Sequence, residues 1–179
     1  MKPDAATLDR RAAELRAAFD RSFAAAAAQA APSEAFLAID VAGDPYALRL
    51  AEIAGLHADK AVTALPGSPP DLLGVAGFRG VLVPVYDLRA LLGYAAGPPA
   101  RWLAVARGKA RVGLAFDRFD GHFAVSPDAV VQGGQPVPSR PGLDGTLQEG
   151  GRPRHVIGLG ALIESIGRRV QKNTIQKER

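Results

Sequence analysis

The amino-acid sequence predicts an all-β fold built from two similar halves, each of which ends in a short helix. Three observations lead to this prediction. Short apolar runs follow one another and are separated by turn-forming residues, which is typical of short strands. The chain is rich in such turn formers, with 20 Gly and 14 Pro among its 179 residues. Each half of the segment 34–166 then ends in a short apolar stretch followed by Gly, as a capped helix would.

The first element is expected to be a helix over residues 4–31. Asp4 can cap its N-terminus, and Pro32 ends it. Its apolar residues recur at helical spacing and form one narrow stripe: Leu8, Ala12, Leu15, Phe19 and Phe23. A lone helix of this kind is marginal in water, so we expect it to dock on its own domain, on a second copy or on a partner helix.

The first half is expected to hold strands and one short helix. Pro84 lies inside an apolar run, and because it cannot donate to a ladder we expect it at a sheet edge or a bulge. Residues 53–57 follow the first two strands and are not assigned to helix or strand. The expected elements are strands Phe36–Val41 and Tyr46–Leu50, a hairpin within residues 75–86 whose tip is Gly77-Phe78-Arg79-Gly80, and a helix Leu88–Leu92 capped by Asp87 and closed by Gly93.

The second half repeats this order of short strands and a closing helix. Residues 107–110 should join its first two strands as a hairpin, residues 117–122 should form a turn region, and residues 132–151, rich in Gly and Pro, should form a long loop. The expected elements are strands Trp102–Ala106, Arg111–Phe116, Phe123–Val125 and His155–Leu159, and a helix Ala161–Ile166 closed by Gly167.

Charge and composition exclude several classes of protein. The formal net charge is +4, and the excess lies in the tail, residues 167–179, so the body offers no broad face for nucleic acid. The absence of Cys excludes a disulfide scaffold and a thiolate metal site. No segment resembles a membrane span or an export signal. We therefore expect a cytoplasmic protein with a frayed basic tail.

The sequence gives no sign of catalysis, of a metal site or of a cofactor. The histidines His57, His122 and His155 lie too far apart for a short-spaced metal motif. Ser68 lies among prolines and lacks the flanking glycines of a nucleophile elbow. The pair Asp117 and Asp120 has a spacing that is typical of a turn with local side-chain caps. We expect a protein that is not an enzyme.

The hairpin tip offers the most informative side chain. Arg79 lies between two glycines, which can adopt a positive φ and leave the backbone uncovered. A guanidinium presented in this way can bind a carboxylate through two hydrogen bonds. Taken alone, the tip is better explained by an ordinary solvated turn arginine.

The stretch around this tip resembles the signature of the CheW-like domain. Matches occur in order and at the right spacing: Leu65-Pro66, Pro69, Gly74-Val75, Arg79-Gly80, Pro84-Val85, Asp87-Leu88 and Leu92-Gly93. Upstream, Tyr46–Leu50 with Ile53 and Leu56 is similar to another conserved stretch of the family, as is Arg111–Asp117 downstream, and residues 155–163 match more loosely. The resemblance covers about residues 34–166, so the helix 4–31 and the basic tail 167–179 lie outside it.

The resemblance implies two small five-stranded β-barrels, SH3-like in shape, packed on a shared core. It implies a non-catalytic coupling protein that bridges the cytoplasmic tips of chemoreceptors and the regulatory domain of a CheA-type histidine kinase. By the same resemblance, Arg79 and Gly80 lie near the surface that faces these partners. An apolar groove for a receptor helix would be lined by Leu50, Ile53 and Leu56, although plain core packing explains these three residues equally well.

The sequence departs from the family pattern at four positions. Gly77-Phe78 replaces Asn-Leu before the Arg-Gly pair, so the tip loses an Asn turn bond and gains an aromatic ring that is exposed or fills a groove. Arg49 replaces a Pro, and Gly158 replaces an Asp. These changes favour an alternative, a divergent CheW-like module that binds one partner, a receptor or a partner helix, without coupling a kinase. A third hypothesis is binding of nucleic acid or a membrane surface through the basic tail.

Overall fold

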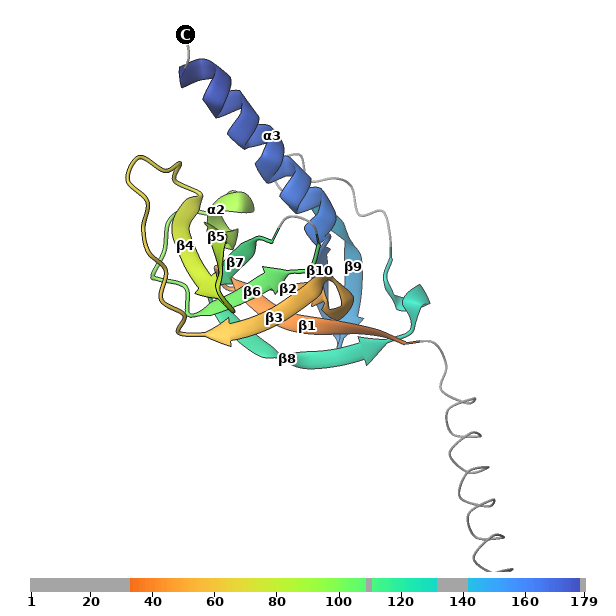
Figure 1. Cartoon of the computed structure of the whole chain (residues 1–179). Helices are drawn as coiled ribbons and strands as arrows, with labels where there is room; N and C mark the ends of the chain where they lie inside the picture. Colours follow the sequence, from red (N-terminus) through yellow and green to blue (C-terminus); the bar gives the residue numbers. More distant parts are fainter. Residues whose placement is uncertain (1–32, 109–110, 132–141, 178–179) are drawn as a thin grey trace, which may run out of the picture. The chain divides into compact units, whose positions relative to one another are not determined.

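The computed structural model describes residues 33–108, 111–131 and 142–177. The chain divides into two compact units, Met1–Ser33 and Glu34–Arg179, and the second unit holds all the elements described below (Figure 1). The expected helix over residues 4–31 lies outside the described residues.

Two five-stranded sheets make up the body. Sheet A has the strand order β8-β1-β2-β10-β9, and sheet B has the order β3-β6-β7-β5-β4. The strands of sheet A are β8 (Arg118–Val125), β1 (Glu34–Val41), β2 (Asp44–Arg49), β10 (Arg152–Ile157) and β9 (Leu143–Glu149). Those of sheet B are β3 (Ile53–Ala58), β6 (Trp102–Ala106), β7 (Gly113–Phe116), β5 (Val81–Asp87) and β4 (Leu72–Phe78).

The two sheets follow one plan. In each, the successive pairs are antiparallel, antiparallel, parallel and antiparallel. The chain runs through five strands and a helix twice, which agrees with the predicted duplication. The sheets do not correspond to the two halves, however, because sheet B uses the continuous stretch 53–116 while sheet A combines β1 and β2 with the last three strands. The outer strands of each sheet, β8 and β9 or β3 and β4, are not paired with each other, so neither sheet is closed into a barrel.

Several strands lie where the apolar runs predicted them, and the differences have physical reasons. The turn region predicted over residues 117–122 is wrong, because β8 already begins at Arg118 and alternates polar with apolar side chains as an edge strand does. The predicted loop over residues 132–151 is wrong from Leu143 onward, where β9 pairs with β10. The unassigned segment 53–57 belongs to β3.

Pro84 lies in an internal strand at a point where that strand has one neighbour. Its partner in β4 is Val75, whose N–H and C=O both bond to Thr63 on the other side. The pairing of β5 with β7 begins only at Val85. The missing N–H of Pro84 therefore costs no ladder bond, and the edge environment predicted for it is present locally.

The hydrophobic core has three parts. The largest lies between the sheets, takes residues from both, and includes Leu48 and Phe116, each fully buried. This is the shared core that the sequence led us to expect. Because side chains alternate along a strand, the opposite face of each sheet packs separately, around Phe36 and Val156 in sheet A and around Phe78 and Val85 in sheet B.

The two helices follow the parallel-paired strands. Helix α2 (Leu88–Leu91) is capped by Asp87, whose Oδ1 accepts from Arg89 N at 2.9 Å. Helix α3 (Leu159–Lys177) has 19 residues, so the predicted end at Gly167 is wrong. It buries Leu162 and Ile166 in the shared core and then continues through the basic segment, extending away from the strands in Figure 1.

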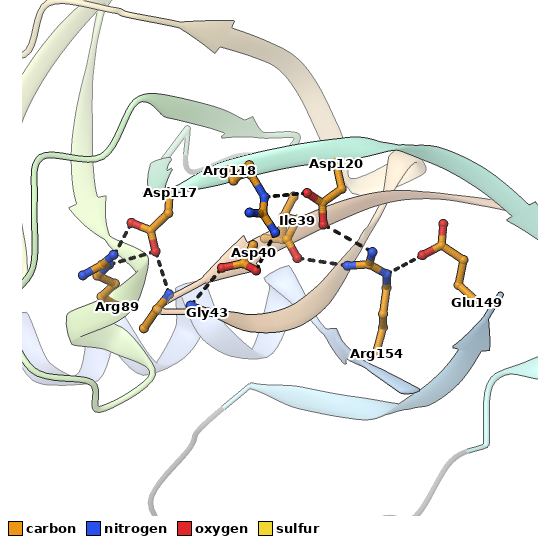
Figure 2. Close-up of polar contacts among 10 residues, drawn as sticks. Ile39, Asp40, Gly43, Arg89, Asp117, Arg118, Asp120, Glu149 and Arg154 are labelled. Atoms are coloured by element: carbon orange, nitrogen blue, oxygen red, sulfur yellow. Dashed lines mark hydrogen bonds and ion pairs between the residues drawn. The ribbon is translucent and has the colours of Figure 1, made fainter. Parts of the chain in front are cut away.

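An ion-pair network occupies one end of sheet A (Figure 2). Its centre is Arg154, which is only 5% exposed. Its guanidinium donates to Glu149 at 2.5 Å, to Asp120 at 3.3 Å and to the carbonyl oxygen of Ile39 at 3.2 Å. The more exposed Arg118 adds bonds to Asp120 and, from the other side, to Asp40. Hydrogen bonding to Asp120 raises the pKa of Arg118 above its ordinary value.

A second ion pair joins the two sheets. Arg89 of α2 donates to both carboxylate oxygens of Asp117, at 2.7 and 2.9 Å, and the same carboxylate accepts from Ala42 N in the β1–β2 turn. The hydrogen bond that Arg89 donates to Asp117 raises the pKa of the arginine. Asp117, predicted to be a local turn cap, therefore joins α2 to sheet A.

Candidate functional site

The tip of the β4–β5 hairpin has an unusual backbone. Phe78 pairs with Val81, which leaves a two-residue turn of Arg79 and Gly80. Both have positive φ, 48° for Arg79 and 79° for Gly80, as a type I′ hairpin turn requires. Gly is suited to this conformation, whereas a side chain there costs about 1 kcal/mol or more. The turn therefore holds an exposed arginine at a position where Asn or Gly is the usual residue. Gly77, expected to share the positive φ, is an ordinary strand residue.

Beside this tip lies a pocket of about 420 Å³, large enough for a side chain or a short peptide segment. It is formed by three parts of sheet B: β3, the β4–β5 hairpin, and the end of the β6–β7 hairpin. Its buried floor is apolar and consists of Phe78, Val83, Val105 and Ala106.

Phe78 connects the two outer strands of sheet B. Its ring lies 4.8 Å from the His57 ring, at 53°, and the Lys60 ammonium lies 5.0 Å from its centroid. These side-chain contacts close the side of the pocket between β3 and β4, where no backbone ladder joins the strands. Phe78 is 9% exposed, so the aromatic substitution fills the groove rather than extending into solvent.

The rim of the pocket is basic, and no described residue that lines it carries a carboxylate. It carries four cations: Lys60, Arg79, Arg107 and Arg111. Arg107 donates to the carbonyl oxygen of Ile53 at 3.1 Å, but within the described residues none of the four forms an ion pair. Elsewhere the arginines with described side chains are ion-paired, apart from Arg152 and Arg168. Unpaired positive charge is therefore concentrated at this pocket.

The predicted site residues separate into two groups. Gly77, Phe78 and Arg79 line the pocket, with Gly80 completing the turn beside it. The predicted groove residues lie elsewhere: Ile53 is buried in the shared core, Leu56 packs against that core, and Leu50 is 41% exposed on a short 3-10 helix, Leu50–Glu52. The burial of Ile53 fits core packing. The part of all three residues in binding stays a prediction.

Four polar lining residues were not predicted from the sequence as part of a site: His57, Lys60, Arg107 and Arg111. A signal for two of them was present, because Arg107 and Arg111 flank a hairpin tip just as Arg79 occupies one. What the sequence does not reveal is that the two tips lie beside the same pocket.

In residues 33–108, 111–131 and 142–177, no three His, Asp or Glu side chains are grouped so that they could hold a metal ion. Within the same ranges, no helix is long and apolar enough to cross a membrane. Binding through the basic pocket is what this geometry supports.

Comparison with known proteins agrees with this fold. Residues 35–167 match the CheW-like domain family. The chain belongs to this family. CheW-like proteins are non-catalytic scaffolds and adaptors of chemotaxis signal transduction. The scaffolding protein TtCheW from Thermoanaerobacter tengcongensis has a similar structure, with a TM-score of 0.65 and 17% sequence identity over 70% of this chain and 89% of TtCheW. No curated protein matches this chain.

Two departures from the CheW-like pattern meet at one carboxylate. Arg49 donates to Asp144 at 2.6 Å and to Glu34 at 2.9 Å. Gly158 lies against the same carboxyl group, because a Cβ at this position would come within 2.9 Å of Asp144 Cγ. An Asp side chain at position 158 would therefore collide with Asp144. The substitutions at Arg49 and Gly158 thus belong to one rearranged ion pair in sheet A and lie outside the pocket.

Proposed function

We propose that this CheW-like protein couples the cytoplasmic tips of chemoreceptors to the regulatory domain of a CheA-type histidine kinase, as a scaffold acting in the cytoplasm. Membership of the family supports a scaffold role. The single observation that carries the proposal is the exposed Arg79 on a strained hairpin turn beside a pocket whose described lining residues include four cations and no carboxylate. Strain of this kind is retained where a surface has a function.

The proposed coupling requires two partners, so the test must measure both. The full-length protein is titrated by calorimetry with the regulatory domain of the cognate kinase, then with a receptor-tip fragment, and finally with both together. We expect binding to each and a ternary complex. Binding to only one partner would replace the proposal with the single-partner module, and binding to neither would refute it.

A charge-reversed pair of variants links the binding to the pocket. Arg79→Glu should weaken binding of at least one partner by roughly tenfold or more, because a cation facing acidic groups is replaced by an anion. Arg152→Glu is the matched control, since Arg152 is also exposed and without an ion-pair partner among the described residues but lies on β10, away from the pocket. Equal loss in the two variants would show a general charge effect and would remove the pocket from the proposal.

A further inference from the structure

The common plan of the sheets allows their positions to be matched. In sheet A, the row of paired residues that begins at Val156 of β10 continues through β2 into β1. In sheet B, the row that begins at Val85 of β5 continues through β7 into β6. Both rows lie on the face turned away from the shared core. On the same face, two residues away from these rows, sheet A carries Arg154 in β10 and Asp40 in β1. At the matched positions, sheet B carries Val83 in β5 and Arg107 directly after β6.

Matched β-bulges support this alignment. In β8 the register shifts between Phe119 and Gly121, which leaves Asp120 as the extra residue opposite β1. In β3 the register shifts at the same place opposite β6, and the extra residue is Ala54. Asp120 and Ala54 are therefore equivalent positions of the two sheets.

The two matched ends differ in charge. The end of sheet A is filled by the carboxylates Asp40, Asp120 and Glu149, all of which pair with arginines there. The matched end of sheet B is the pocket. There Arg107 replaces Asp40 and Ala54 replaces Asp120, so cations are present, and among the described lining residues no carboxylate balances them as in sheet A.

We infer that the pocket binds an acidic peptide segment of a partner protein, whose carboxylates pair with Arg79, Arg107 and Arg111 and whose apolar side chain packs on Phe78. The carboxylates of the segment supply the negative charge that Asp40 and Asp120 supply to the arginines of sheet A. This inference rests on the proposed function for its setting and names the chemistry by which a partner is recognised.

The floor of the pocket distinguishes a peptide from a phosphate ligand. Free phosphate or a nucleic-acid backbone would satisfy the rim cations but would leave the apolar floor uncovered. Glutamate or aspartate next to an aromatic or aliphatic side chain complements both the rim and the floor.

The test uses the full-length ¹⁵N-labelled protein and a capped peptide, acetyl-Glu-Glu-Phe-Glu-Glu-amide, followed by NMR. The amide signals of Gly55, Gly77 and Gly108 report on the pocket, because all three line it. We expect these signals to shift, and the affinity to fall at least tenfold for acetyl-Gln-Gln-Phe-Gln-Gln-amide and at high salt. Equal binding of the two peptides, or shifts confined to other residues, would overturn the inference. So would inorganic phosphate or a short oligonucleotide that shifts the same glycines more strongly than the peptide.

A variant that fills the pocket from within gives the sharper test. Ala54→Asp places a carboxylate at the position equivalent to Asp120 and should reduce peptide affinity at least tenfold. Ala51→Asp adds the same charge on the exposed 3-10 helix outside the pocket and should leave the affinity unchanged. Arg111→Gln should also lower the affinity for the peptide. This second variant keeps the test decisive if Ala54→Asp folds poorly. Retained affinity in Arg111→Gln and Ala54→Asp would overturn the inference.

The outcome is separable from that of the proposed function. Failure of the acidic peptide while kinase and receptor still form a ternary complex would refute the pocket chemistry alone. Peptide binding without any ternary complex would refute the coupling function alone.

Discussion

A substitution of Arg154 measures how much the ion-pair network in sheet A contributes to the free energy of unfolding. We predict that Arg154→Met destabilises the protein strongly, because the guanidinium is 5% exposed and donates to Glu149, Asp120 and a backbone carbonyl. Met keeps most of the side-chain volume and removes only the charge and the donors.

The magnitude follows from the burial of each partner. A hydrogen bond to a charged group contributes about 1.5–3 kcal/mol, and removing one partner of a fully buried ion pair costs about 3–5 kcal/mol. The partner side chains here are partly exposed, 25% for Asp120 and 32% for Glu149, so water can replace part of what is lost. Asp120 also keeps Arg118. We therefore expect a loss of about 2–4 kcal/mol in the free energy of unfolding.

Urea denaturation at neutral pH measures this loss, with Arg118→Met as the matched control. Both arginines contact Asp120, but the Arg118 side chain is 64% exposed, so its removal should change the free energy of unfolding little. Both variants remove an arginine that pairs with Asp120, so the difference between their free energies of unfolding measures the effect of burying the arginine. If Arg154→Met were no more destabilising than Arg118→Met, the network would not contribute to stability as described.

Three further predictions concern the turn, a close approach and pH. Arg79→Gly should raise the free energy of unfolding by about 0.5–1 kcal/mol, since Gly relieves the positive φ, while weakening partner binding; a destabilised variant in urea would contradict this. Gly74→Ala should unfold at lower urea than Gly77→Ala, because its Cβ would meet Thr63 O at 2.1 Å, whereas Gly77 has no atom within 4 Å. Burial raises the pKa of Tyr86 above 10.0. The stability that the protonated tyrosine contributes is therefore complete below about pH 10 and is lost at higher pH. Tyr86→Phe should reduce the fall in the free energy of unfolding that urea titrations measure between about pH 8 and 11.

Local patterns predicted the strands that contain a continuous apolar run. Trp102–Ala106 lies where it was expected, and β1 extends the expected run by two residues, because both strands are buried against a core on each face. Strand β9 was missed, and only the last three residues of β8, Phe123–Val125, were predicted as a strand, because the apolar content of both strands is low and each contains a glycine. Helix α3 was predicted too short, since Gly167 was taken as its end although the residues after it are good helix formers.

The candidate site was predicted only where it lies within one hairpin. The glycines and Arg79 mark that hairpin in the sequence, and the resemblance to CheW-like domains adds to this signal. Arg107 and Arg111 join the site through the pairing of β6 with β3 and β7, which unites segments far apart in the chain. No local pattern contains that pairing, and the absence of facing carboxylates is visible only when sheets A and B are compared position by position.

The path of the chain between the sheets bears on how an adaptor transmits geometry. The backbone passes from sheet A to sheet B through the three residues after β2, and returns through the single residue between β7 and β8. Two short covalent crossings and a common core oppose rotation of one sheet against the other. The whole of Glu34–Arg179 accordingly forms one compact unit. Proteins bound to different sheets would be kept at a constant angle to each other. Substitutions at the pocket would therefore change the lifetime of the complex without changing the orientation of the bound partner.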